Sequence, residues 1–179
     1  MAIVVVCGSG RGVGKTSLVC GLIAAIPEMR WTACKITSHD HGKPEPVWEE
    51  TESQGATDTA RFRAAGAERA LLISASNDEL EAALSGVLVG PREKANAIFE
   101  SNRILQHVKP DLCLAVASSF GQPAKPSFAR AIERMDALVM RGDEDDVREG
   151  ATPRFVLANL ERPSAPIIAW VRARLRTQG

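Results

Sequence analysis

The stretch that decides the fold lies near the N-terminus and reads Gly8-Ser9-Gly10-Arg11-Gly12-Val13-Gly14-Lys15-Thr16-Ser17. Before it stands the run Ala2–Cys7, which is rich in β-branched residues and predicts a strand buried on both faces. After it, apolar residues recur at helical spacing through Lys15–Ile26, and the pattern stops before Pro27. The sequence therefore predicts a strand, a glycine-rich loop and a helix.

A glycine-rich turn between a strand and a helix can wrap its backbone N–H groups around a phosphate at the helix N-terminus. Measured against the phosphate-loop pattern G-x-x-x-x-G-K-[ST], Gly14, Lys15 and Thr16 match, whereas Ser9 stands where the first glycine is expected. In this pattern the lysine reaches the β and γ phosphates and the Thr16 hydroxyl binds Mg²⁺. We therefore expect the loop to bind a nucleoside triphosphate, GTP or ATP, together with Mg²⁺. A glycine-rich turn with a surface lysine is the alternative.

The expected nucleotide-binding residues are Ser9, Gly10, Arg11, Gly12, Val13, Gly14, Lys15, Thr16 and Ser17. Arg11 either touches a phosphate or is simply exposed at the tip of the loop.

Strand and helix patterns alternate along the rest of the chain. Strands are expected at Trp31–Thr37, Arg69–Ser74, Ala95–Glu100, Asp111–Ala117, Asp136–Met140 and Arg154–Leu160, and helices at Asp58–Ala65, Asp78–Leu88, Phe128–Met135 and Pro163–Arg176. Asn77 is expected to cap the second of these helices, and Ser38–Thr57 to form a loop. The alternation predicts one doubly wound α/β domain over residues 1–179, with a mainly parallel sheet and helices on both faces.

Composition limits the classes of partner. Lys plus Arg and Asp plus Glu both number 22 in a chain of 179 residues, so no overall charge draws it to nucleic acid or to an anionic membrane. The four cysteines lie in apolar runs without a CxxC pair, which is typical of buried thiols in a reducing cytoplasm. We find no signal-peptide pattern and no apolar run of 18 residues. We expect a cytoplasmic protein.

Lys35 and Glu100 each end an apolar run that predicts a core strand. Ligands of α/β sheets bind at the carboxyl ends of the strands. We expect Glu100 to hold Mg²⁺, directly or through water, or to polarise an attacking water, and Lys35 to stabilise charge on a transferred phosphoryl group. The alternatives are an acid that caps the Ser101-Asn102 turn and a lysine at a sheet edge. With Lys15, these are the predicted catalytic residues.

Asp58 stands at the start of an expected helix. It either caps that helix or provides a second carboxylate at the Mg²⁺ site, and its position after Thr57 favours the cap.

His39, Asp40 and His41 form a polar cluster inside the expected loop. Imidazole and carboxylate groups are ordinary ligands of divalent ions, so the cluster is a candidate for contact with a metal or an anionic substrate. Solvated loop histidines are the alternative.

Three features resemble the molybdopterin-guanine dinucleotide biosynthesis protein B family and, more distantly, the dethiobiotin synthetases. The phosphate loop lies close to the N-terminus and ends Val13-Gly14-Lys15-Thr16, as in dethiobiotin synthetases. Lys35 followed by Ser38-His39-Asp40-His41 is similar to a lysine and histidine-rich stretch of the molybdopterin family. Asp58–Ala67 resembles that family's helix running into an Ala-Gly-Ala turn. The similarity spans Ile3–Met140.

The resemblance implies a nucleotide-hydrolysing accessory protein that helps a partner enzyme attach or handle the molybdenum cofactor, with slow turnover and a homodimer or a docking surface. No Asn-Lys-x-Asp guanine motif follows the strand ending at Met140, where the chain reads Arg141-Gly142-Asp143-Glu144-Asp145, so GTP and ATP both stay open. Two other hypotheses stand beside it. One is an ATP-dependent small-molecule kinase or ligase of dethiobiotin synthetase type, with an acceptor pocket in Ser38–Thr57. The other is a binding module in which nucleotide only orders the loop.

Overall fold

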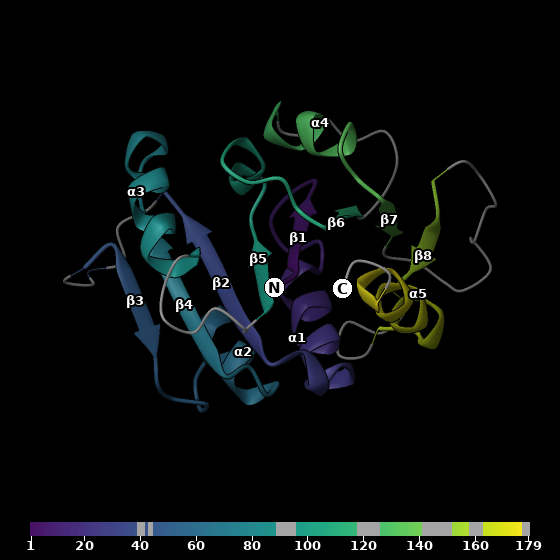
Figure 1. Ribbon diagram of the computed structural model, residues 1–179, viewed down its shortest axis with the longest axis horizontal. Helices are drawn as coiled ribbons and strands as arrows, with labels where there is room; N and C mark the ends of the chain where they lie inside the picture. Colours follow the sequence, from purple (N-terminus) through teal and green to yellow (C-terminus); the bar gives the residue numbers. More distant parts are fainter. Residues whose placement is uncertain are drawn as a thin grey trace.

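The computed structural model describes residues 1–38, 42, 45–88, 96–117, 126–140, 152–157 and 163–176. Within these residues one sheet has the strand order β3-β4-β2-β5-β1-β6-β7-β8, which runs from left to right in Figure 1. The strands are β1 Ile3–Gly8, β2 Trp31–Thr37, β3 Val47–Glu50, β4 Arg69–Ser74, β5 Asn96–Glu100, β6 Leu112–Ala117, β7 Ala137–Met140 and β8 Arg154–Val156. The helices are α1 Lys15–Ala25, α2 Asp58–Ala64, α3 Asn77–Leu88, α4 Pro126–Ile132 and α5 Ala165–Arg176, with short 3₁₀ turns η1 Pro27–Met29 and η2 Arg103–Gln106.

Every neighbouring pair of strands in the sheet is parallel except β3 and β4, which are antiparallel. The central strands are almost wholly buried and rich in Val, Ile and Leu, as strands covered on both faces require. The predicted doubly wound, mainly parallel α/β fold is confirmed.

Each face of the sheet has its own apolar core. On one face, alternate residues such as Val4 and Val6 of β1 pack with buried residues of α1, α2 and α5. On the other face, Val5 and Cys7 pack with buried residues of α3, η2 and α4. Because side chains alternate between faces along a strand, a single apolar strand supplies both cores.

The predicted loop Ser38–Thr57 contains a strand, so this part of the prediction is wrong. β3 lies within it and pairs with β4 at the edge of the sheet, with Trp48 opposite Leu72. Its four residues are too few for a clear alternation pattern, and an edge strand shows less apolar character than a central one.

The cap of α3 is Ser76, one residue before the predicted Asn77. The Ser76 hydroxyl accepts a hydrogen bond from the Glu79 N–H at 3.3 Å, while the Glu79 carboxylate accepts one from the Ser76 N–H at 3.0 Å. These reciprocal bonds form a capping box, which satisfies two N–H groups at the start of the helix. Asn77 instead accepts a hydrogen bond from Arg103.

The last helix is held against the first. Gly21 of α1 faces Pro163, just before α5, so closely that a β-carbon at Gly21 would lie 2.0 Å from the Pro163 Cδ. Arg172 of α5 donates to the Ala25 carbonyl and pairs with Glu28. α5 therefore lies beside α1, as Figure 1 shows. Among the helices described, none is long and apolar enough to cross a membrane.

Candidate functional site

The glycine-rich loop joins the buried strand β1 to the buried helix α1. Its backbone uses the left-handed region at Gly12, with φ of 75°, and at Gly14, with φ of 106°, where a β-carbon is disfavoured. Gly14 is the N-cap residue of α1, and its carbonyl accepts the first helical hydrogen bond from the Leu18 N–H at 2.9 Å. The two glycines therefore turn the chain directly into the first turn of α1.

Lys15 folds back over the loop that it follows. Its ammonium donates to the Gly10 carbonyl at 2.5 Å, and its aliphatic carbons lie against Gly8, where a β-carbon would come within 2.6 Å of the Lys15 Cδ. Only glycine at position 8 leaves room for this arrangement. The ammonium is thus held against the loop backbone at Gly10.

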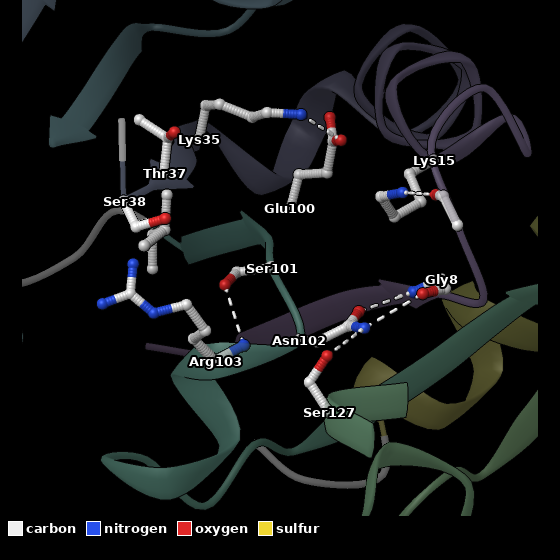
Figure 2. Close-up of a pocket in the computed structure, with 12 residues that line it drawn as sticks. Gly8, Lys15, Lys35, Thr37, Ser38, Glu100, Ser101, Asn102, Arg103 and Ser127 are labelled. Atoms are coloured by element: carbon white, nitrogen blue, oxygen red, sulfur yellow. Dashed lines mark hydrogen bonds and ion pairs between the residues drawn. The ribbon is translucent and has the colours of Figure 1, made fainter. Parts of the chain in front are cut away.

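Asn102 fixes the start of the loop. Its side-chain oxygen accepts from the Gly8 N–H at 2.8 Å, and its side-chain nitrogen donates to the Gly8 carbonyl at 3.0 Å and to the Ser127 hydroxyl at 3.3 Å (Figure 2). Gly8 stays paired with Val116 of β6, and the two bonds from Asn102 satisfy its backbone on the β5 side, where strand pairing ends at Val6 and Glu100. Neither Asn102 nor Ser127 was predicted as a site residue, because neither lies in a motif.

Three predicted residues meet at the carboxyl ends of β2 and β5. Lys35 of β2 stands opposite Glu100 of β5 in the sheet register, and its ammonium forms an ion pair with the Glu100 carboxylate (Figure 2). The Thr16 hydroxyl donates to the other oxygen of that carboxylate at 2.7 Å. The Glu100 side chain is only 1% exposed, so both oxygens are used inside the protein. Glu100 does not cap the turn that follows it, where the Ser101 hydroxyl accepts from the Arg103 N–H.

Asp58 joins this group and does not cap α2. Thr57 is the cap, because its hydroxyl accepts from the Ala60 N–H at 3.1 Å. The Asp58 carboxylate lies 2.9 Å from the Lys35 ammonium instead. The favoured interpretation of Asp58 as the cap is therefore wrong, and the carboxylate faces the site.

The charges of the cluster set its protonation. Burial lowers the pKa of Lys35, but the Glu100 and Asp58 carboxylates more than offset this and raise it above its ordinary value. Burial raises the pKa of Asp58, while the Lys35 ammonium and the Thr16 hydroxyl bring it below its ordinary value. Both groups are therefore charged at neutral pH.

The other predicted residues lie in different surroundings. Arg11 is exposed, and Ser17 is buried and accepts a hydrogen bond from Arg61 at 3.3 Å. His39, Asp40 and His41 lie outside the described residues, as does the stretch Arg141-Gly142-Asp143-Glu144-Asp145, in which a guanine motif is missing.

A pocket of about 230 Å³ opens beside the loop. It is lined by Gly8, Gly10, Lys15, Lys35, Ile36, Thr37, Ser38, Glu100, Ser101, Asn102, Arg103 and Ser127. Figure 2 shows Lys15 and Gly8 on one side of it and Ser38 and Arg103 on the other. The lining carries three cationic side chains and one carboxylate, a balance that favours an anionic ligand.

The oxygens gathered here suit Mg²⁺. This ion prefers oxygen ligands and usually takes one or two carboxylates together with phosphate oxygens and water. Thr16 and Glu100 place a hydroxyl and a carboxylate oxygen 2.7 Å apart at the start of α1, and Asp58 adds a second carboxylate nearby. The donor set therefore fits the metal that accompanies a nucleoside triphosphate.

No protein-family model matches the sequence, and no curated protein matches it. Among solved structures, the chain is similar to the X-ray crystal structure of a MobB protein homolog from Bacillus stearothermophilus. The TM-score is 0.51 at 20% sequence identity, and the match covers 99% of each chain. At this identity the likeness bears on the fold. The chain thus shares the α/β fold of that MobB homolog over nearly its whole length.

Proposed function

We propose that the protein binds a nucleoside triphosphate with Mg²⁺ and hydrolyses it slowly. The observation that carries this proposal is the hydrogen bond between Thr16 and Glu100, 2.7 Å long, beside a lysine-bearing glycine loop. It joins the hydroxyl that follows the loop lysine to a buried carboxylate on a neighbouring strand. A hydroxyl and an acid in these two positions are the protein ligands that phosphate-loop proteins use for Mg²⁺.

Each residue has a distinct task in this proposal. The loop amides and Lys15 bind the β and γ phosphates, with Gly12 and Gly14 giving the backbone its shape. Thr16 and Glu100 hold Mg²⁺, with Asp58 as a further carboxylate. The metal, when bound, neutralises charge on the phosphates. Lys35 faces the transferred group or the attacking water from the end of β2.

We further propose an accessory role in molybdenum-cofactor (molybdopterin-guanine dinucleotide) biosynthesis, beside a partner enzyme. Its support is the fold likeness to a MobB homolog along 99% of both chains, together with the loop and helix features that resemble that family. Slow hydrolysis fits this role. In the cluster of Lys35, Glu100 and Asp58, both carboxylates pair with Lys35, so the cluster holds no unpaired base for hydrolysis.

An ATP-dependent kinase or ligase of dethiobiotin synthetase type is the second candidate. The pocket favours it, since the pocket continues past Lys35 to Thr37, Ser38 and Arg103. In this candidate the acceptor would lie at that end of the pocket, beside the phosphates. A binding module that does not hydrolyse nucleotide is the third reading.

Calorimetric titration with non-hydrolysable GTP and ATP analogues, each with and without Mg²⁺, tests the proposal. We expect binding that strengthens with Mg²⁺. Preference for GTP supports the molybdenum-cofactor role, and preference for ATP supports the kinase or ligase. Failure of both analogues to bind contradicts the nucleotide assignment itself. Turnover that requires a small acceptor separates the second candidate from the first, and no turnover at all supports the third.

A further inference from the structure

Arg103 lies in the pocket but has no part in the nucleotide site proposed above. It begins η2, directly after the loop-fixing Asn102. Its Nε donates to the Asn77 side-chain oxygen at 2.8 Å, and its Nη2 donates to the Ala75 carbonyl at 2.9 Å. Two of its three nitrogens therefore hold the guanidinium in one orientation.

The third nitrogen is left over. Nη1 of Arg103 is buried and has no hydrogen-bond partner among the described residues. A buried N–H group without a partner is energetically costly, and more so when it carries charge. The described residues thus leave the Arg103 guanidinium one acceptor short, and a water, an ion or a ligand would supply it.

The charge of Arg103 is also uncompensated in the part of the chain that the structure describes. Its two partners are a neutral amide and a neutral carbonyl, and none of the ion pairs found there includes it. Lys35 also lines the pocket, but its charge is neutralised by Glu100 and Asp58. The far side of the pocket thus carries one fixed positive charge.

Hydroxyl groups also line the pocket. Thr37 and Ser38 line the pocket from the end of β2, and Ser127 lines it from α4. Figure 2 shows the Arg103 guanidinium on the Ser38 side, opposite Lys15. A guanidinium together with hydroxyl donors is the usual protein environment for a phosphate or carboxylate group.

We propose that the Arg103 side of the pocket binds the phosphate or carboxylate group of a second small molecule, beside the nucleotide. This inference rests on the proposed function, because the nucleotide phosphates occupy the Lys15 side and leave the Arg103 side open. Arg103 and the Ser38 hydroxyl bind the anionic group, while Lys35 lies between the two ligands.

The test uses the full chain saturated with Mg²⁺ and a non-hydrolysable triphosphate analogue, so that the loop is already filled. Inorganic phosphate, methyl phosphate and acetate are then added separately, and binding is followed by phosphorus or carbon nuclear magnetic resonance. We expect at least one of these anions to bind wild type. Binding of the phosphates alone assigns a phosphate ester, and binding of acetate alone assigns a carboxylate.

Arg103→Gln should lower the affinity for the added anion by at least about tenfold, because a charge-assisted hydrogen bond is lost. It should leave the affinity for the analogue unchanged. Arg134→Gln is the matched control, since Arg134 also donates to a backbone carbonyl but does not line the pocket. Ser38→Asp places a carboxylate at an exposed lining position and should repel the anion without any effect on folding.

Three outcomes overturn the inference but leave the proposed function intact. In the first, no anion binds the saturated wild type, and in the second, Arg103→Gln and Ser38→Asp both bind the anion as wild type does. In the third, Arg103→Gln lowers the affinity for the analogue itself. If Arg103→Gln does not fold, Ser38→Asp decides the question. Failure of wild type to bind the analogue overturns the proposed function, and the inference with it.

Discussion

Lys35 and Glu100 stand directly opposite one another on β2 and β5, and their side chains form an ion pair at the carboxyl end of the sheet. They are 65 residues apart in the chain. The pair connects the start of α1, through Thr16, to the start of α2, through Asp58. One buried carboxylate thus joins the loop that would bind nucleotide to a neighbouring helix.

Removal of Lys15 is the direct test of the loop. Lys15→Ala should weaken binding of a triphosphate analogue by at least about tenfold, because a charged hydrogen-bond donor to the phosphates is lost. The melting temperature should stay close to that of wild type. Calorimetry and thermal unfolding measure the two effects.

The control for Lys15→Ala is Lys109→Ala, which removes an exposed lysine after η2. Its affinity should equal that of wild type. Equal affinity of Lys15→Ala and wild type would remove the basis for placing phosphates at this loop.

Lys35→Met should destabilise the fold by about 3 kcal/mol, because it leaves the buried Glu100 carboxylate without its counter-charge. Adding Glu100→Gln to Lys35→Met should restore part of this loss, since the uncompensated charge is then gone as well. Urea unfolding of the single and double variants measures the coupling between the two residues.

The matched control is Arg30→Met, which breaks the exposed pair with Glu68 and should change the free energy of unfolding very little. Strictly additive effects of Lys35→Met and Glu100→Gln would mean that the ion pair does not stabilise the protein.

Acid should destabilise the protein partly through Asp58. The pKa of Asp58 in the fold is below its ordinary value of 3.8, so its contribution to stability is present above that value and is lost as the pH falls through the folded pKa. Wild type should therefore be more stable than Asp58→Asn at pH 7, and the difference should shrink towards zero in strong acid.

Unfolding by urea at a series of pH values between about 2 and 7 measures this difference, in the acid range where carboxylates titrate. Asp78→Asn, at an exposed position in the first turn of α3, serves as the control carboxylate. A difference between wild type and Asp58→Asn that stays constant across the range would contradict the pairing of Asp58 with Lys35.

Gly8→Ala should lower the affinity for a triphosphate analogue, and its effect on the thermal stability of the fold should be the smaller of the two. A β-carbon there would lie 2.6 Å from the Lys15 Cδ and would push the lysine side chain off the loop. Gly86→Ala is the matched control: Gly86 lies in α3, where a β-carbon meets nothing within 4 Å, and alanine should stabilise that helix by about 0.5–1 kcal/mol. Calorimetry and thermal unfolding of both variants measure the contrast. Wild-type affinity in Gly8→Ala would show that the lysine moves aside without cost.

Much of the fold could be predicted because its signals are local. The apolar strand Trp31–Thr37 and the strand Arg69–Ser74 have the bounds predicted from the sequence. The helix at Lys15 differs by one residue at its end. Such segments combine strong apolar runs with clear breaks, and both properties can be read from neighbouring residues.

The arrangement of the site depends on strand order, which local patterns do not contain. Lys35 and Glu100 were each predicted at a strand end, but their pairing follows only once β2 and β5 are neighbours in the sheet. Asn102 and Arg103 were given no role because their partners, Gly8 and Ala75, are distant in the sequence. The short strand β3 was missed for a different reason, since the pairing with β4 and not its own composition makes it a strand.

The contact between Gly21 and Pro163 bears on how the chain is completed during synthesis. Residues before β8 already supply the whole middle of the sheet, yet the side of α1 at Gly21 is covered only when Pro163 and α5 arrive. On the ribosome, the first helix is thus covered in two stages: β1, β5 and α2 can pack against it early, and its Gly21 side is covered only at the end. A nascent chain that ends before Pro163 therefore leaves α1 uncovered at Gly21.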